Sequence, residues 1–185
     1  ARPPRDAPLM PEDTAKALLR AAGVRVPQGF SAPTLAELIP AARALPGKLV
    51  LKGLGFAHKT EAGAVRLGLS GLEGEADIPG ATGYLVEDMW PAPVAEMLVG
   101  LRRDPVHGLT LTLGIGGITA ELLADTVTLV LPLGAAEILS ALHHLRLFAL
   151  LDGYRGRPRA DLPALADLAL RLGDLMQTDD SIEEI

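Results

Sequence analysis

The chain has 185 residues, of which 49% are apolar and only 3% aromatic, so it can form one large domain or two small ones with a core of Leu, Ala and Val. Seventeen Lys and Arg residues against 23 Asp and Glu residues give a net charge of −6, and because the cations are scattered we expect no nucleic-acid partner. The absence of cysteine excludes disulfides and thiolate metal sites and favours a reducing, cytoplasmic location.

Two helices are predicted near the N-terminus. Residues 1–10 are rich in proline and lack an apolar signal core, so we interpret them as a linker. Residues 11–22 predict a helix, because Pro11 suits its first position and acids occupy its first turn. A second short helix is expected to begin after Thr34, a favoured N-cap residue, and to end before Pro46.

Short strands dominate the middle of the chain. The first is predicted at residues 48–54. Similar apolar runs, separated by Gly, Pro and Asp turns, follow at residues 64–69, 83–89, 94–102, 109–114 and 126–131. This pattern indicates a mixed or antiparallel sheet.

Helical spacing returns at residues 135–151 and 162–176, so the whole chain predicts an α+β fold with flanking helices. His143 and His144 interrupt the first of these runs, and no apolar run reaches the length of a membrane span. Because the two histidines are adjacent on a helix, we expect a structural or surface role for them rather than a metal site. The final residues predict the start of a strand that is truncated at the C-terminus.

Lys52 is unusual because it lies inside an apolar strand. Its charge must find an anionic partner or reach solvent. Phosphate is one candidate partner, and an exposed lysine on an edge strand is the alternative.

Three glycines, Gly114, Gly116 and Gly117, occupy four positions at the end of an apolar run. Glycine removes the Cβ atom and tolerates positive φ, so such a loop lets backbone N–H groups approach phosphates. A tight turn or a sheet corner explains the same residues. Arginines at positions 102, 103, 155, 157 and 159 belong either to a solvated face or to a polyphosphate site.

A glycine-rich segment, residues 51–69, carries His58, Lys59 and Glu61. A loop histidine can act as a base, a phosphoryl acceptor or a metal ligand. One histidine without a partner at ligand spacing makes a poor metal site, so the first two roles stay open.

Seven strings occur in a fixed order along the chain: LLRAAGVRVP, VLKGLGFAHKTEAGAVRLGL, YLVEDM, EMLVGLRRDPVHG, LGIGGITAELLAD, LLDGYRGRPRADLPALADLALRL and IEEI. Together they resemble the ATP-grasp domain of the ADP-forming (NDP-forming) acyl-CoA synthetases. This family includes acetate–CoA ligase and modules fused to protein acetyltransferases. The resemblance implies an ATP-grasp domain over residues 11–185, with possible subdomains at 11–63 and 84–185.

The resemblance also implies residue roles. His58 would receive a phosphoryl group and pass it toward the nucleotide, while the main phosphohistidine would belong to a separate CoA-binding domain or subunit. Ala64 stands where the family has a second glycine, and we expect its methyl group to restrict the loop. ATP/ADP and Mg²⁺ are the implied cofactors, with the metal ligands expected after residue 185. The implied nucleotide-binding residues are Lys52, Glu87, Met89, Glu96, Arg103, Gly114, Gly116 and Gly117, and the backbone near Glu87 to Met89 would hold adenine.

Two functions follow from this resemblance. The first is the nucleotide-binding part of an enzyme that converts an acyl group, CoA and ATP to acyl-CoA, ADP and phosphate; we expect the isolated chain to be inactive. The alternative is a non-catalytic regulatory domain that senses a nucleotide or CoA and is fused to an acetyltransferase. A purely structural fragment is a third interpretation.

Overall fold

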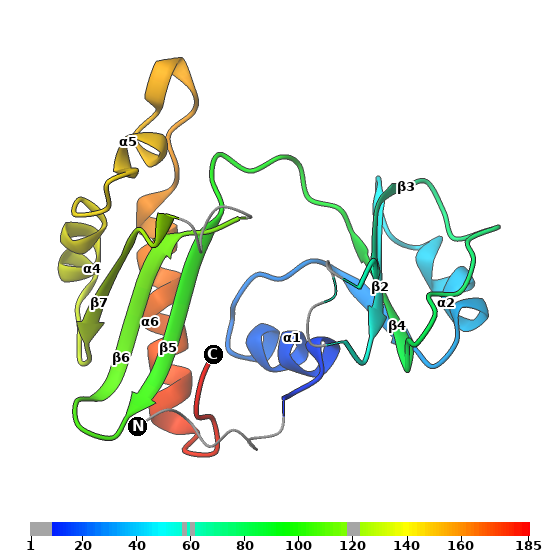
Figure 1. The fold of residues 1–185 in the computed structure, drawn as a ribbon, viewed down its shortest axis with the longest axis horizontal. Helices are drawn as coiled ribbons and strands as arrows, with labels where there is room; N and C mark the ends of the chain where they lie inside the picture. Colours follow the sequence, from blue (N-terminus) through cyan, green and yellow to red (C-terminus); the bar gives the residue numbers. More distant parts are fainter. Residues whose placement is uncertain (1–8, 57–58, 60–61, 118–122) are drawn as a thin grey trace. The chain divides into compact units, whose positions relative to one another are not determined.

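The computed structural model describes residues 9–56, 59, 62–117 and 123–185. The chain divides into two compact units, Pro8–Pro91 and Ala92–Ile185, and each unit builds its own sheet (Figure 1). The expected subdomain of residues 84–185 needs correction, because strand β4, Gly83–Asp88, pairs with two strands of the first sheet. In the described part of the chain, no helix has the length and apolarity needed to cross a membrane.

The N-terminal unit contains an antiparallel sheet of strand order β1-β4-β2-β3. The expected helices and strands form close to their predicted bounds, and Thr34 caps α2 by accepting a hydrogen bond from the Glu37 amide at 3.4 Å. The sequence did not predict β1, a short edge strand whose residues show no apolar alternation. The elements are α1 Glu12–Ala21, β1 Gly29–Ala32, α2 Leu35–Ala42, β2 Leu49–Leu54, β3 Val65–Leu69 and β4.

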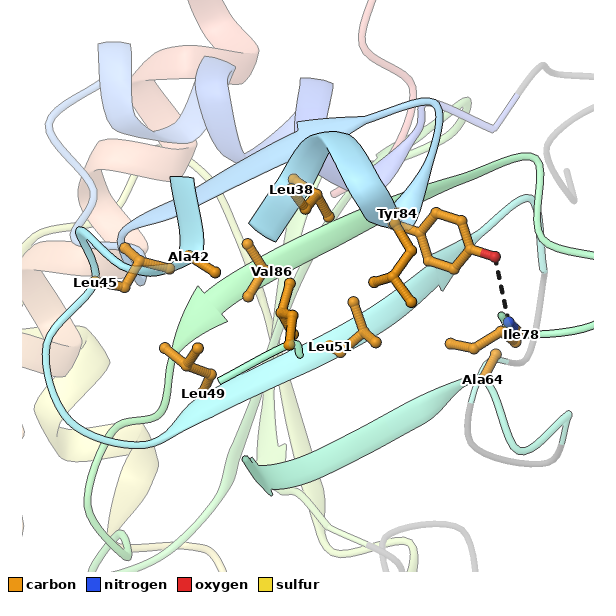
Figure 2. Packing of buried hydrophobic residues seen from close by; sticks show 11 residues of the cluster. Leu38, Ala42, Leu45, Leu49, Leu51, Ala64, Ile78, Tyr84 and Val86 are labelled. Atoms are coloured by element: carbon orange, nitrogen blue, oxygen red, sulfur yellow. Dashed lines mark hydrogen bonds between the residues drawn. The ribbon is translucent and has the colours of Figure 1, made fainter. Parts of the chain in front are cut away.

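The core of this unit lies between α2 and one face of the sheet (Figure 2). Side chains alternate along a strand, so Leu51 of β2 and Val86 of β4 point toward α2, and both are fully buried. The Tyr84 hydroxyl accepts a hydrogen bond from the Ile78 amide at 3.2 Å, which satisfies the polar end of a buried ring. Ala64 is also fully buried in this core, so its methyl group is a packing contact.

The C-terminal unit contains an antiparallel sheet of order β5-β6-β7, with α6 packed against it beside α4 (Figure 1). A Cβ atom on Gly173 of α6 would lie 2.9 Å from the Leu131 side chain, so glycine permits the close approach of the helix. The elements are β5 Met97–Asp104, β6 Gly108–Ile115, β7 Thr126–Val130, α4 Ala135–Leu142, α5 Phe148–Leu151, the 3-10 turn η1 Tyr154–Gly156 and α6 Leu162–Thr178.

The single helix predicted at residues 135–151 is wrong, because α4 ends at Leu142 and α5 begins only at Phe148. Asp125, which is 6% exposed, accepts hydrogen bonds from the backbone amides of Arg146 and Leu147, each at 2.9 Å. Burial works against the Asp125 charge, but these two amides and the Arg146 guanidinium hold its pKa below the usual range. Asp125 thus binds two backbone amides that would donate to backbone carbonyls in a continuous helix.

The C-terminal residues extend the second sheet. Leu101 and Ile185 exchange both backbone hydrogen bonds, at 3.0 and 2.9 Å, and the Arg103 amide donates to the Glu183 carbonyl at 3.0 Å. The predicted start of a strand at residues 182–185 is confirmed by this pairing with the outer edge of β5.

Candidate functional site

Charged side chains gather on the face of the first sheet that points away from the α2 core. Lys52 alternates with buried Leu51 on β2, which directs it to this face. Glu87 lies on neighbouring β4, where its register partner is Val50, so Glu87 and Lys52 are diagonal neighbours. Helix α1 brings Glu12 and Lys16, one helical turn apart, to the same place.

Three ammonium groups share two carboxylates in this charged cluster, which consists of Glu12, Lys16, Lys52, Lys59 and Glu87. Glu12 contacts Lys16 at 2.8 Å, Lys52 at 2.6 Å and Lys59 at 3.0 Å. Glu87 contacts Lys16 at 2.6 Å and Lys52 at 2.8 Å. The cluster therefore carries one excess positive charge in a partly desolvated site, an arrangement that favours an anionic ligand.

Burial and ion pairing have opposite effects on the pKa values of Glu12 and Lys52, and the effect of ion pairing is the larger. Burial opposes the charge of Glu12, yet its contacts with Lys16, Lys52 and Lys59 hold its pKa at about 2. Burial likewise opposes the charge of Lys52, but Glu12 and Glu87 raise its pKa well above the usual range. Lys52 is therefore a permanent cation, suited to charge neutralisation rather than to proton transfer.

A cavity of about 660 Å³ opens beside the cluster, within the N-terminal unit. Its size falls in the range of small-molecule sites. Glu12, Asp13 and Lys59 contribute charge to its wall, and Gly55 and Thr82 contribute polar backbone and hydroxyl groups. The lining residues are 9–14, 54–56, 59 and 82.

The end of β4, where the family resemblance implies that the backbone near Glu87 to Met89 holds adenine, has little backbone donor capacity left. The Asp88 amide donates to the Gln28 carbonyl at 2.9 Å, and the Met89 amide donates to the Lys48 carbonyl at 2.7 Å. The Glu87 side chain is 3% exposed and belongs to the charged cluster, whereas Met89 is 41% exposed. Adenine contact at this position would thus rely on the Met89 side chain and on carbonyl groups.

The predicted glycine loop lies in the C-terminal unit, next to Glu96. The Gly116 amide donates to the Glu96 carbonyl at 2.7 Å, and a Cβ atom on Gly117 would lie 2.8 Å from the Glu96 carboxylate. A Cβ atom on Gly114 would lie 2.7 Å from the Thr126 side chain. Close packing at this sheet corner therefore already requires glycine, and a phosphate role for the loop stays a prediction.

Arg103 lies on the side of β5 that faces α6. Its guanidinium donates to the carbonyls of Ile182 at 2.9 Å and Asp179 at 3.0 Å, and also to Met176. It thereby joins the end of α6 to the sheet, and its predicted nucleotide contact stays untested.

The adjacent Asp104 holds a turn. It accepts hydrogen bonds from the amides of Val106 and His107, both at 2.9 Å. The hydrogen bond from the His107 amide, followed by that from Val106, holds the Asp104 pKa at about 2.

His58, the predicted phosphoryl acceptor, lies outside the described residues. Its neighbour Lys59 is described: the Lys59 side chain contacts Glu12, and its carbonyl accepts a hydrogen bond from the Ala64 amide at 2.8 Å. The Ala64 carbonyl in turn accepts from the Gly53 amide at 2.8 Å. Lys59 is thus tied to the charged cluster and, through Ala64, to strand β2.

Sequence reasoning missed Glu12 and Lys16 as site residues. An acid and a lysine four positions apart on a helix usually form a surface pair, and the spacing gives no sign of a third partner. Only the fold brings Glu87 to them. In the described ranges, no three His, Asp or Glu side chains gather in a way that would hold a metal ion.

Known proteins resemble the chain over nearly its whole length. A family model described as an ATP-grasp domain matches residues 5–185. A trans-feruloyl-CoA synthase from an unknown prokaryotic organism is 34% identical over 96% of the chain, which spans 27% of that relative. The beta subunit of an ADP-forming acetate–CoA ligase I from Pyrococcus furiosus is 28% identical over 94% of the chain and 82% of the subunit.

A solved structure has the same fold. It is an acetyl-coenzyme A synthetase 1 from Ca. Korarchaeum cryptofilum in complex with coenzyme A and Mg-AMPPCP, with its phosphohistidine segment pointing towards the nucleotide binding site. The TM-score is 0.81 at 29% identity, over 94% of this chain and 81% of that one.

Proposed function

The chain belongs to the ATP-grasp domain family, and from this membership we propose that it binds ATP for an ADP-forming acyl-CoA synthetase. The overall reaction would convert an acyl group, CoA and ATP to acyl-CoA, ADP and phosphate. The observation that carries the proposal is Lys52, a permanent cation on the sheet, held in a cluster with one excess positive charge beside a cavity. The relatives that carry out CoA ligation support the choice of reaction.

The described residues would act mainly through charge. Phosphoryl transfer depends on positioning and on neutralising the phosphate oxygens. Lys52 and Lys59 supply ammonium groups for this purpose, and the glycines at 114, 116 and 117, with Glu96 and Arg103, are proposed to act near the nucleotide. Mg²⁺ would add further neutralisation, with ligands outside the described residues.

His58 is proposed as the phosphoryl relay. In this step the bond between the γ-phosphorus and the oxygen that bridges to ADP breaks, a phosphorus–nitrogen bond forms on the imidazole, and the imidazole loses its ring proton. A neutral imidazole is a competent acceptor at pH 7. In the direction of acyl-CoA synthesis, the phosphoryl group would then pass to a CoA-binding domain or subunit with its own phosphohistidine; in the reverse direction, His58 would pass it toward the nucleotide. Because the chain has no cysteine, we propose a cytoplasmic location.

Product analysis tests this proposal. The full protein is incubated with ATP, CoA and a panel of small carboxylic acids, and nucleotide products are separated by chromatography. We expect ADP and phosphate in step with acyl-CoA, and loss of both in His58→Ala while ATP binding persists. Formation of AMP and pyrophosphate, or wild-type turnover by His58→Ala, would contradict the proposed reaction or the relay respectively.

A further inference from the structure

Glu87 is the most enclosed member of the charged cluster, with a side chain that is only 3% exposed. Lys16 donates to both of its oxygens, at 2.6 and 2.7 Å, and Lys52 contacts it at 2.8 Å. A buried carboxylate that loses its counter-ion is strongly destabilised, because neither water nor a second cation replaces the lost partner. A cation that is the sole partner of Glu87 is therefore held in place, because its departure would leave the buried carboxylate unpaired.

To bind a phosphate in the cavity, Lys52 would move away from Glu87 and from Glu12, which it contacts at 2.8 and 2.6 Å. Glu12, which is partly exposed, would keep Lys59 as a partner. Without Lys16, that movement would leave Glu87 charged, buried and unpaired. With Lys16 in place, Glu87 keeps a cation on both oxygens throughout the movement. Lys16 on helix α1 thus supplies the charge that lowers the free-energy cost of moving Lys52 away from Glu87.

We propose that Lys16 is a positioning residue: it neutralises Glu87 and so frees Lys52 for an anionic ligand. The inference rests on the proposed function, since it takes Lys52 as the phosphate-binding group. Lys16 acts through Glu87 and does not touch the nucleotide. Both Lys16 and Lys59 contact Glu12, at 2.8 and 3.0 Å, but only Lys59 lines the cavity, where it can meet a phosphate directly.

A double-mutant cycle distinguishes this indirect role from direct contact. Binding of β,γ-methylene ATP with Mg²⁺ to the full protein is measured by titration calorimetry for wild type, Lys16→Gln, Glu87→Gln and the double variant. Lys16→Gln should weaken binding about tenfold or more, because Lys52 stays on Glu87. In the Glu87→Gln background the same change should alter affinity by less than about threefold, because position 87 no longer carries a buried charge that Lys52 must neutralise. The exposed Arg43, which pairs with Glu73, provides the control Arg43→Gln, with affinity unchanged.

Three results overturn the inference. Equal loss of affinity from Lys16→Gln in both backgrounds shows direct contact with the nucleotide, and wild-type affinity of Lys16→Gln shows no role. Absence of binding by the wild type removes the proposed function and the inference together, whereas the first two results leave that function intact. If Lys16→Gln alone fails to fold and the double variant folds, the misfolding itself shows that Lys16 acts through the Glu87 charge. A difference in affinity of more than about threefold between Glu87→Gln and the double variant then refutes the inference, and a smaller one supports it.

Discussion

Replacing Glu12 with glutamine tests whether the ion pairs of the charged cluster stabilise the N-terminal unit. The carboxyl group has an ordinary pKa of 4.5 and a folded-state pKa of about 2. This difference converts to about 3 kcal/mol of stability, and partial contact of Glu12 with water reduces it to about 1–2 kcal/mol. We therefore expect Glu12→Gln to lower the urea midpoint by about 1 M at pH 7, given a slope of about 1–2 kcal/mol per M.

The contribution of the Glu12 carboxylate to stability depends on pH with a definite sign. A folded pKa below the ordinary value means that folding favours the ionised form, so the contribution is fully present above pH 4.5 and is lost as the pH falls toward 2. Wild type and Glu12→Gln should therefore differ at pH 7 and pH 5 and converge as the pH falls further.

Urea unfolding followed by the fluorescence of Trp90, the only tryptophan, reports on this unit directly. Asp13→Asn, the neighbouring acid in the same helical turn, is the matched control and should change little. Equal midpoints for wild type and Glu12→Gln at pH 7, or a difference that persists unchanged at pH 3, would refute the role given to these ion pairs.

Two further substitutions test the packing of each unit. Leu51→Ala removes a fully buried side chain and should cost about 2–5 kcal/mol in urea unfolding, whereas Leu67→Ala, at a 64% exposed position of the same sheet, should cost about 0.5 kcal/mol or less; similar costs would contradict the core as described. Gly114→Ala would place a Cβ atom 2.7 Å from the Thr126 side chain and should lower stability by about 1–3 kcal/mol in thermal unfolding followed by circular dichroism. Gly100→Ala is its control, because a Cβ atom there would lie 3.8 Å from the Ile185 carbonyl oxygen, an ordinary van der Waals contact; equal effects of the two would refute the tight sheet corner.

Much of the fold could be predicted from local patterns, and the errors arise from non-local contacts. Strands β2 to β7 and helices α1, α2 and α6 follow from apolar spacing, caps and turns. The helix break before α5 could not be predicted, because Asp125 acts on amides 21 and 22 residues away. The division into two sheets depends on the pairing of β4 with β1 and β2, which no local pattern encodes.

The candidate site shows the same limit. Lys52 was predicted from its place in an apolar strand, and the need of its charge for an anionic partner is confirmed by Glu12 and Glu87. Lys16 was missed, because the contact that matters joins residues 71 positions apart. A site residue that is unusual for its local sequence, such as Lys52, can therefore be predicted from the sequence. Its ion-pair partners from distant parts of the chain can be identified only from the fold.

The most direct test of the account is ATP binding by the full protein before and after Lys52→Met, measured by titration calorimetry with Mg²⁺ present. We expect wild type to bind and Lys52→Met to bind at least about tenfold more weakly, equivalent to about 1.4 kcal/mol. Trp90 fluorescence should show that the variant is folded, since Glu87 keeps Lys16 as its partner. Lys48→Met, which removes an exposed lysine bonded to Ser70, should bind like wild type. A folded Lys52→Met variant with wild-type affinity would contradict the assignment of Lys52 as the phosphate-binding cation.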